Sequence, residues 1–353
     1  SIDSAPLITP TFSLRGKALT EKIPHLFEAL GEIATSMRFD ERARIKEVAV
    51  QLDTALQHRL ASKPLGYALA LAASSCSPQR ALLHLAGGLP YVELIHRIAH
   101  DDGALDSAIA QCSELMQQIT AATPQLVVSG GDDVAEHLES NGWYGYNRAP
   151  SRAVWKEAPS MHHLPSQIRL SALPVAFIAH AQQTVPYSHP DAPALAVSTY
   201  LMENTGLHKR IREQGGAYGS GASYDLGSGL FSFHTYRDPH IAPSLDAFRA
   251  SIDEIGACDF TDDHLEEAKL GLIQTLDTPV PPGDRAITAY SLLRARKDDA
   301  VRQRFRDALF DLSKEDIAEA VSHHLDFDAG TSVAFANEAL AEKEGLDLEL
   351  VRS

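Results

Sequence analysis

Cysteine is scarce in this chain. Its 353 residues include three cysteines, which are far apart and form no Cys-x-x-Cys pair: Cys76, Cys112 and Cys258. This spacing excludes a cysteine zinc knuckle and gives no support to a set of disulfides. No apolar run approaches the roughly 18 residues that a membrane-spanning helix needs. The opening SIDSAPLITP has no basic-then-apolar targeting pattern, although the first residue of a fragment would carry no such information. We expect a soluble protein, with the cytoplasm as its compartment.

Motifs for nucleophilic catalysis and for phosphate binding are also missing. The sequence has no Gly-x-Ser-x-Gly, and the glycine-rich 219–221 has neither the spacing nor the lysine of a phosphate-binding loop. Two histidine pairs, His162-His163 and His323-His324, are adjacent in the chain, and adjacent residues on a helix do not face the same way. We therefore predict no metal site at either pair.

Positive charge is in deficit. The formal net charge of −16 argues against nucleic acids and anionic membrane surfaces as partners. Two interpretations of the acidity stay open: an acidic surface that receives basic peptides, or a solvated acidic surface that favours solubility. The hydrophobic content of 44% and charged content of 22% are typical of a globular protein. At this length, two domains are expected.

The most informative stretch is 207–238, LHKRIREQGGAYGSGASYDLGSGLFSFHTYRD. It predicts a basic helical turn, a break at Gly215-Gly216 and a β-hairpin whose turn is 225–229. Glycine permits the positive φ that such a break can require. Arg212 would then end a helix and Tyr218 would begin a strand, so that a guanidinium and a phenol could converge on one carboxylate or carbonyl oxygen. An ordinary helix-to-strand connection is the alternative.

This stretch resembles a known family. RIREQGGAYGSGA followed by GLFSFHTYRDP is similar to the C-terminal half of the pitrilysin/insulinase superfamily of zinc metallopeptidases, in its presequence-protease branch. The resemblance implies that Arg212 and Tyr218, with Gly216 and Ala217 between them, hold the backbone of a substrate peptide near the zinc of the other half. It also implies a supporting role in the chamber wall for the end of the hairpin, which is Tyr236, Arg237 and Asp238.

The zinc motif of this family is not present. The family's order is His-x-x-Glu-His, in which two imidazoles bind zinc and the glutamate activates water. Two near-matches, His25 to Ala29 and His264 to Ala268, have alanine in place of the second histidine. The first could be a decayed zinc motif or a coincidence. We predict no metal and no cofactor on this chain, and the resemblance places the zinc in a catalytic half that this sequence lacks.

Apolar periodicity predicts an α+β protein. Predicted helices are Lys17–Arg38, a long helix after Asp40, Tyr67–Ser75, Pro78–Leu85, Tyr91–His100, Leu105–Ala121, Val134–Asn141, Asp191–Glu203, Ile241–Ile255, Asp262–Leu276, Asp284–Arg296, Ala300–Phe310 and Lys314–His323. Outside the hairpin, predicted strands are Thr9–Arg15, Leu126–Ser129, one within Ile168–Thr184, and Thr331–Ala336. Helix caps are expected from Asp40, from Asp191, from Thr261 with Asp262, and from Ser313 with Asp316.

The segment 142–161 breaks every period and contains both tryptophans, which predicts a domain boundary. We predict a first α+β domain over 1–141, a linker over 142–164 whose aromatic residues pack onto neighbouring domains, and a second α+β domain over 165–353. The resemblance implies that these are two homologous domains, the third and fourth of the full-length enzyme. Each would be a mainly antiparallel sheet packed with several helices.

The expected function is therefore that of the C-terminal half of a zinc-dependent peptide-degrading metalloendopeptidase. This half would form the chamber wall, would hold the substrate with Arg212 and Tyr218, and would be inactive alone. Its partners would be an N-terminal catalytic half and unstructured peptides, with no nucleic acid and no membrane. A separate, non-catalytic peptide-binding subunit that partners a zinc-bearing chain is the alternative, and a purely structural subunit is another.

Overall fold

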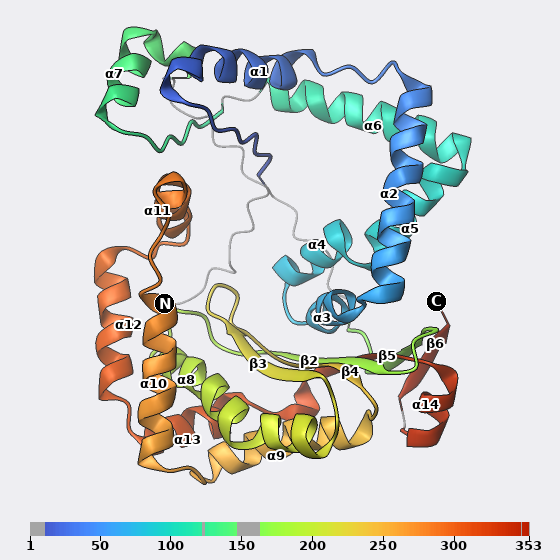
Figure 1. Cartoon of the computed structure of the whole chain (residues 1–353), viewed down its shortest axis with the longest axis vertical. Helices are drawn as coiled ribbons and strands as arrows, with labels where there is room; N and C mark the ends of the chain where they lie inside the picture. The colour runs from blue at the N-terminus through green and yellow to red at the C-terminus, as the bar shows by residue number, and fades with distance from the viewer. Residues whose placement is uncertain (1–10, 122–123, 147–162, 347, 353) are drawn as a thin grey trace. The chain divides into compact units, whose positions relative to one another are not determined.

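The computed structural model describes residues 11–121, 124–146, 163–346 and 348–352 (Figure 1). Contacts divide the chain into two compact units that are interleaved in sequence. The first comprises Ser1–Thr54, Glu93–Ala158 and Pro279–Arg296, and the second comprises Ala55–Val92, Pro159–Thr278 and Lys297–Ser353. The division into 1–141, 142–164 and 165–353 stays a prediction, and most of its linker, 147–162, lies outside the described residues.

The first unit is helical in the part of the chain that the structure describes. Its elements are η1 (Thr20–Lys22), α1 (Ile23–Ser36), the first part of α2 (Arg42–Ser62), most of α5 (Leu89–His100), α6 (Asp102–Ala121), α7 (Asp132–Ser140), η2 (Gly142–Gly145), η4 (Pro282–Asp284) and α11 (Arg285–Arg294). Tyr144 stacks on Phe27 of α1 with ring centroids 4.4 Å apart, so this aromatic residue of the predicted linker does pack onto a neighbouring helix.

Two predicted strands in this unit are wrong. Residues 11–15 and 126–129 are irregular, and 9 and 10 lie outside the described residues. A strand is stable only when a neighbour accepts its backbone hydrogen bonds, and no described segment of this unit pairs with either stretch. Their apolar residues are therefore not evidence of a second sheet.

The second unit is built on one six-stranded sheet of order β3-β4-β2-β5-β1-β6. Its strands are β1 (Gln167–Leu170), β2 (Ala176–Gln183), β3 (Gly219–Asp225), β4 (Leu230–Asp238), β5 (Thr331–Ala336) and β6 (Glu349–Arg352). β2 pairs antiparallel with β4 and β5, and β3 with β4, whereas β1 pairs parallel with both β5 and β6. The α+β class and the mainly antiparallel sheet are thus confirmed in this unit.

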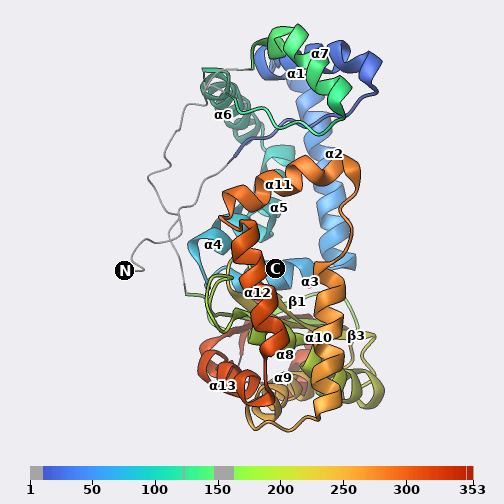
Figure 2. The ribbon, with the colours of Figure 1, turned by 90° about the vertical axis from the view of Figure 1, so that its left-hand side faces the viewer.

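Helices cover both faces of this sheet (Figure 2). One face packs against α8 (Ala192–Met202), η3 (Glu203–Gln214) and α9 (Ala242–Gly256). Three more helices pack against this layer: α10 (Asp262–Leu276), α12 (Asp299–Asp311) and α13 (Lys314–His324). The other face receives α3 (Leu65–Ala73), which contacts β2, β4 and β5. The remaining elements are α4 (Pro78–Gly87), η5 (Phe327–Ala329) and α14 (Glu338–Glu344).

The main core lies between the sheet and α8, η3 and α9. Phe231 and Phe233 of β4 are fully buried, and the Phe233 ring stacks on Phe248 of α9 with centroids 5.1 Å apart. Because side chains alternate along a strand, Ser232, His234 and Tyr236 face the opposite side of the sheet.

Two of the predicted helix caps are present. Ser313 and Asp316 form a capping box, and Thr261 accepts from the backbone of His264, whose ring completes a second box. The predicted cap at Asp191 is wrong. Its side chain makes no cap hydrogen bond to α8, and its carboxylate oxygen lies 2.7 Å from Nε2 of His324.

Candidate functional site

The break at Gly215-Gly216 is the hinge that the sequence predicts. The helix η3 ends at Gln214, and β3 begins at Gly219. Gly216 has φ of 76°, a conformation that side chains disfavour, whereas Gly215 does not. The backbone of Ala217 is fixed by a 3.0 Å hydrogen bond from its N–H to the carbonyl of Ile211, and its side chain is buried. The hinge is therefore a defined turn between a helix and a strand.

Arg212 and Tyr218 stand on the two sides of this hinge. Arg212 is in the last turn of η3 and is exposed, and its guanidinium has no hydrogen-bond or ion-pair partner among the described residues. Tyr218 is 64% exposed although it is a large aromatic residue. Its hydroxyl, too, has no hydrogen-bond partner within the described ranges. Both polar groups are thus available to another molecule.

The ring of Tyr218 packs against residues at the end of β4. Its centroid lies 5.4 Å from that of Tyr236, with the two rings tilted by 54°. The guanidinium carbon of Arg237 lies 5.7 Å from the Tyr218 ring centroid, in cation–π range. The Tyr218 N–H also donates to the carbonyl of Arg237 over 3.3 Å. Two residues at the end of β4, Tyr236 and Arg237, thus contact the Tyr218 ring.

Arg237 owes its position to a β-bulge. The pairing of β2 with β4 shifts between Ala176 and Phe177, which face Asp238 and Tyr236, so Arg237 is the extra residue. Its φ is 51°, in the left-handed region. Bulges re-aim side chains and are frequent next to functional sites. The guanidinium of Arg237 lies over the ring of Tyr218.

Asp238 is a buried support. It is 1% exposed, and its carboxylate accepts from Ser244 Oγ at 2.7 Å and from the backbone N–H of His240 at 3.0 Å. Burial raises the pKa of Asp238, and these hydrogen bonds oppose the rise. Asp238 thereby ties the end of the hairpin to the first turn of α9.

The helix that carries Arg212 is a π-helix, and it is anchored on both sides. Arg210 forms a two-pronged ion pair with Glu254 of α9, in which Nη1 donates to Oε2 over 2.7 Å. At the other end, Glu203 accepts from the backbone N–H of Ala222 over 3.1 Å and so occupies the open edge of β3. Burial raises the pKa of Glu203. Long π-helices are rare, and short ones are frequent at functional sites.

The near-matches to a zinc motif have other roles. His25 and Glu28 form an exposed pair on α1, with Nδ1 3.6 Å from the carboxylate. His264 caps α10 through its backbone and ring.

His324 lies near Asp191 and His189 in a group that could hold a metal. Nδ1 of His189 is 3.7 Å from the carboxylate of Asp191 and also accepts a hydrogen bond from the N–H of Asp191. His162 lies outside the described residues.

The comparisons with known proteins point to one family. A family model described as PreP C-terminal domain matches residues 186–330, which includes the hinge, and a second, described as associated with the C subfamily of M16 peptidases, matches 2–98. The presequence protease, mitochondrial, of Danio rerio is 28% identical over 339 residues, which cover 88% of this chain and 33% of that protein. The protein of the same name in Yarrowia lipolytica is 26% identical over 95% of this chain and 34% of its own length.

The chain belongs to the pitrilysin/insulinase (M16) peptidase family, in its presequence-protease-like branch. It spans about a third of the length of these relatives and corresponds to their C-terminal, non-catalytic part. The family that the hinge sequence predicted is confirmed.

Solved structures agree on the fold. A peptidase M16 inactive domain from Pseudomonas fluorescens matches with a TM-score of 0.58 at 15% identity, over 90% of this chain and 75% of that one. A protease from Helicobacter pylori matches with a TM-score of 0.60 at 15% identity, over 90% and 77%. At this identity the likeness concerns the fold alone.

The compartment of this M16 chain stays a prediction. The relatives carry the word mitochondrial in their names, whereas the sequence led us to expect the cytoplasm. Among the described helices, none combines the length and the apolar character that crossing a membrane would require.

Proposed function

We propose that this chain is the substrate-holding half of a zinc metalloendopeptidase and that it works with an N-terminal catalytic half, as one fused chain. The observation that carries the proposal is a pair of polar groups on a fixed hinge, neither of which has a hydrogen-bond or ion-pair partner among the residues that the structure describes. Arg212 and Tyr218 are exposed, whereas the surrounding Ala217, Asp238 and Arg210 are all held by hydrogen bonds or burial.

Each of the two residues has a specific role in this proposal. The phenol of Tyr218 donates a hydrogen bond to the scissile carbonyl oxygen as that oxygen gains charge, and such a donor is most effective when it is already in place. The packing of Tyr236 and Arg237 against the ring supports this role because it fixes the ring before the substrate arrives. Arg212 binds the peptide backbone and orients it, with Gly216 and Ala217 offering close approach.

The partners follow from the same proposal. Unstructured peptides are the substrates, the face of the sheet that Tyr236 occupies belongs to the chamber wall, and zinc belongs to the catalytic half. The net charge of −16 supports basic peptides as the preferred class.

Peptidase activity is the first test. We expect no turnover of unstructured peptides by this chain alone, and turnover once the catalytic half is added in trans or fused. Turnover by these 353 residues alone would overturn the proposal. Activity in trans would not by itself exclude the alternative of a separate binding subunit; the upstream reading frame decides between the two.

The roles of the two residues are tested in the complemented enzyme. Tyr218→Phe keeps the ring and removes the donor, and we expect kcat to fall on the order of 10²–10³ with little change in KM. Tyr236→Phe is the matched control, because it removes a neighbouring hydroxyl from the same cluster. Undiminished kcat in Tyr218→Phe would refute the role of the phenol.

Arg212 is tested by its effect on binding. Arg212→Ala should raise KM and weaken binding of a labelled peptide to the chain, whereas Lys209→Ala removes a cation from the same helix and serves as control. Equal effects of the two substitutions would mean that general charge, and not Arg212, attracts the peptide.

A further inference from the structure

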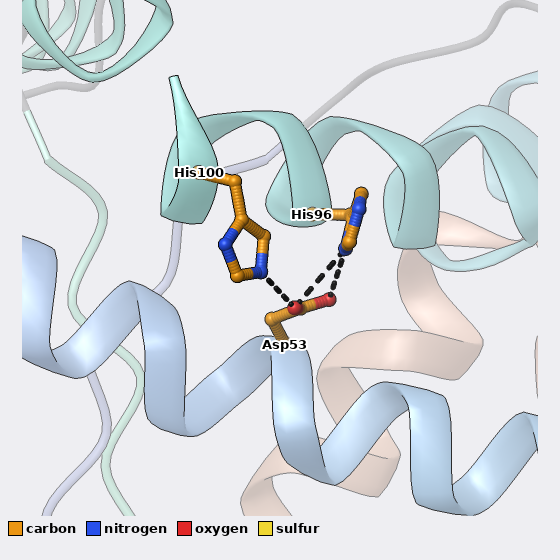
Figure 3. Close-up of side chains that lie close together, drawn as sticks. All are labelled: Asp53, His96 and His100. Atoms are coloured by element: carbon orange, nitrogen blue, oxygen red, sulfur yellow. Dashed lines mark hydrogen bonds and ion pairs between the residues drawn. The ribbon is translucent and has the colours of Figure 1, made fainter. Parts of the chain in front are cut away.

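Three side chains of metal-ligating types meet in the first unit, which does not contain the hinge (Figure 3). Asp53 projects from α2, and His96 and His100 project from α5, one helical turn apart. Nδ1 of His96 lies 3.1 Å from Oδ2 of Asp53, and Nε2 of His100 lies 3.0 Å from the same oxygen. The two imidazole rings are 4.6 Å apart. Both rings therefore point at one carboxylate.

The position of Asp53 is unusual for a carboxylate. On α2 it follows Ala49 by four residues and precedes Leu56 by three, and all three residues are buried. This is the spacing of an apolar helix face. An ionised carboxylate in such a place is costly unless it is paired or binds a metal. The side chain of Asp53 is 8% exposed, whereas those of His96 and His100 are 56% and 55% exposed.

The donor set has the chemistry of a transition-metal site. Two imidazole nitrogens and one carboxylate oxygen are ligands for zinc and related divalent ions, and histidines at i and i+4 on one helix face are a common way to place two of them. Calcium and magnesium prefer sites made of oxygen atoms. We propose that Asp53, His96 and His100 form a site for a divalent transition metal of the zinc class.

The distances fit this occupant. One donor atom from each residue can be chosen so that all three lie within 4.8 Å of one another. Zinc–nitrogen and zinc–oxygen bonds of about 2.0–2.1 Å in a tetrahedron require donor separations of about 3.3 Å. The pairs at 3.0 and 3.1 Å need only a small opening. The exposed side of the two imidazoles leaves the fourth position to water.

The bound ion would connect two helices. Because α2 and α5 carry the ligands separately, binding ties α2 to α5 and should raise the melting temperature of the chain. The site is independent of the proposed peptide-binding role, since it uses none of the hinge residues. A hydrogen-bonded clasp between Asp53 and the two histidines, without metal, is the competing interpretation.

Zinc titration of the chain tests the proposal. The chain carries Cys112→Ser, because Cys112 is an exposed thiol that could take zinc. Isothermal titration with zinc should show stoichiometric binding that is lost in His96→Ala and in His100→Ala. His58→Ala removes an exposed histidine of α2 outside the cluster, and it should bind as the parent does. Cobalt should bind with the visible absorption of a low-coordinate site, and magnesium should not bind.

His100→Gln separates the metal from the clasp. Glutamine can still donate a hydrogen bond to Asp53 but is a poor zinc ligand, so this variant should keep the metal-free melting temperature and lose the rise that zinc causes. The proposal is overturned if zinc does not bind the folded parent. It is also overturned if zinc binding survives in His96→Ala, His100→Ala and His100→Gln alike. Loss of binding in His189→Ala instead would assign the zinc to the group at Asp191.

Discussion

A Cβ atom placed on Gly219 would lie 2.1 Å from Cε1 of Tyr236. The two residues are direct partners across β3 and β4, and the Tyr236 ring occupies the space that a side chain at 219 would take. Since the same ring packs against Tyr218, the absence of a side chain at Gly219 is what lets the two tyrosines lie together.

Gly219→Ala should therefore move Tyr236 and loosen Tyr218. We expect a loss of about 1–3 kcal/mol in the free energy of unfolding, as is usual for overpacking, together with weaker peptide binding. Urea unfolding measures the first effect, and anisotropy of a labelled peptide measures the second. Gly87→Ala is the matched control, because a Cβ there would meet nothing within 4 Å. If the two substitutions gave the same stability, the contact with Tyr236 would not be tight.

Arg237 should respond to substitution in an unusual order. Its φ of 51° costs an alanine about 1–2 kcal/mol, whereas glycine adopts this conformation freely. Arg237→Gly should thus be more stable than Arg237→Ala, by about 1 kcal/mol, in urea unfolding. Both should lose the contact with the Tyr218 ring, so both should weaken peptide binding. An alanine variant as stable as the glycine variant would show that the bulge relaxes.

Asp238 should be required for stability at the end of the hairpin. Asp238→Ala leaves the buried Ser244 hydroxyl and the His240 N–H without their acceptor, at a cost of about 1–3 kcal/mol. Asp238→Asn keeps an acceptor and should cost less. Asp246→Ala, at an exposed site of α9, is the control for loss of one negative charge. Thermal unfolding compares the three, and an alanine variant with the stability of the control would contradict the tie to α9.

The buried His180 should make the fold sensitive to acid. It is fully buried and stacks on Phe327, and burial lowers its pKa from 6.5 to about 4. In the unfolded chain, His180 therefore takes up a proton below about pH 6.5. In the folded chain it takes up this proton only near pH 4. Stability from this residue is complete above pH 6.5 and falls as the pH drops towards 4.

Between pH 7 and pH 5 this linkage amounts to about 2 kcal/mol. His180→Phe keeps a ring against Phe327 and cannot take a proton, so its stability should fall less over that range by this amount. Urea unfolding of parent and variant at the two pH values gives the difference. Parallel pH dependence in the two proteins would rule His180 out as the cause.

The sequence predicted the hinge because its signals are local. Gly215-Gly216 and the turn 225–229 interrupt the regular secondary structure within one stretch. The structure has the helix, the hinge and the hairpin at those positions. The sequence signals for most helices are local as well, and these helices lie where the spacing of their apolar residues predicts them.

What the sequence did not predict depends on distant partners. The parallel pairing of β1 with β5 and β6 joins segments far apart in the chain, and β6 was not predicted at all. The bulge at Arg237 exists only through the pairing of β4 with β2. The His96 and His100 spacing was visible, but its third member, Asp53, comes from another helix 43 residues earlier than His96. Long-range contacts of this kind leave no pattern in a single sequence.

The π-helical winding of η3 has a consequence for changes in chain length. Hydrogen bonds to the fifth residue back hold more chain in each turn than the α-helical bonds to the fourth. Deletion of one exposed residue near its start, such as Asn204, would leave one residue fewer to form these wide turns between α8 and Gly215. Every residue after the deletion would then turn about the helix axis, and Arg212 with them. The number of residues in η3 thus sets the direction of one guanidinium, and a chain shortened there would keep its hairpin but point Arg212 elsewhere.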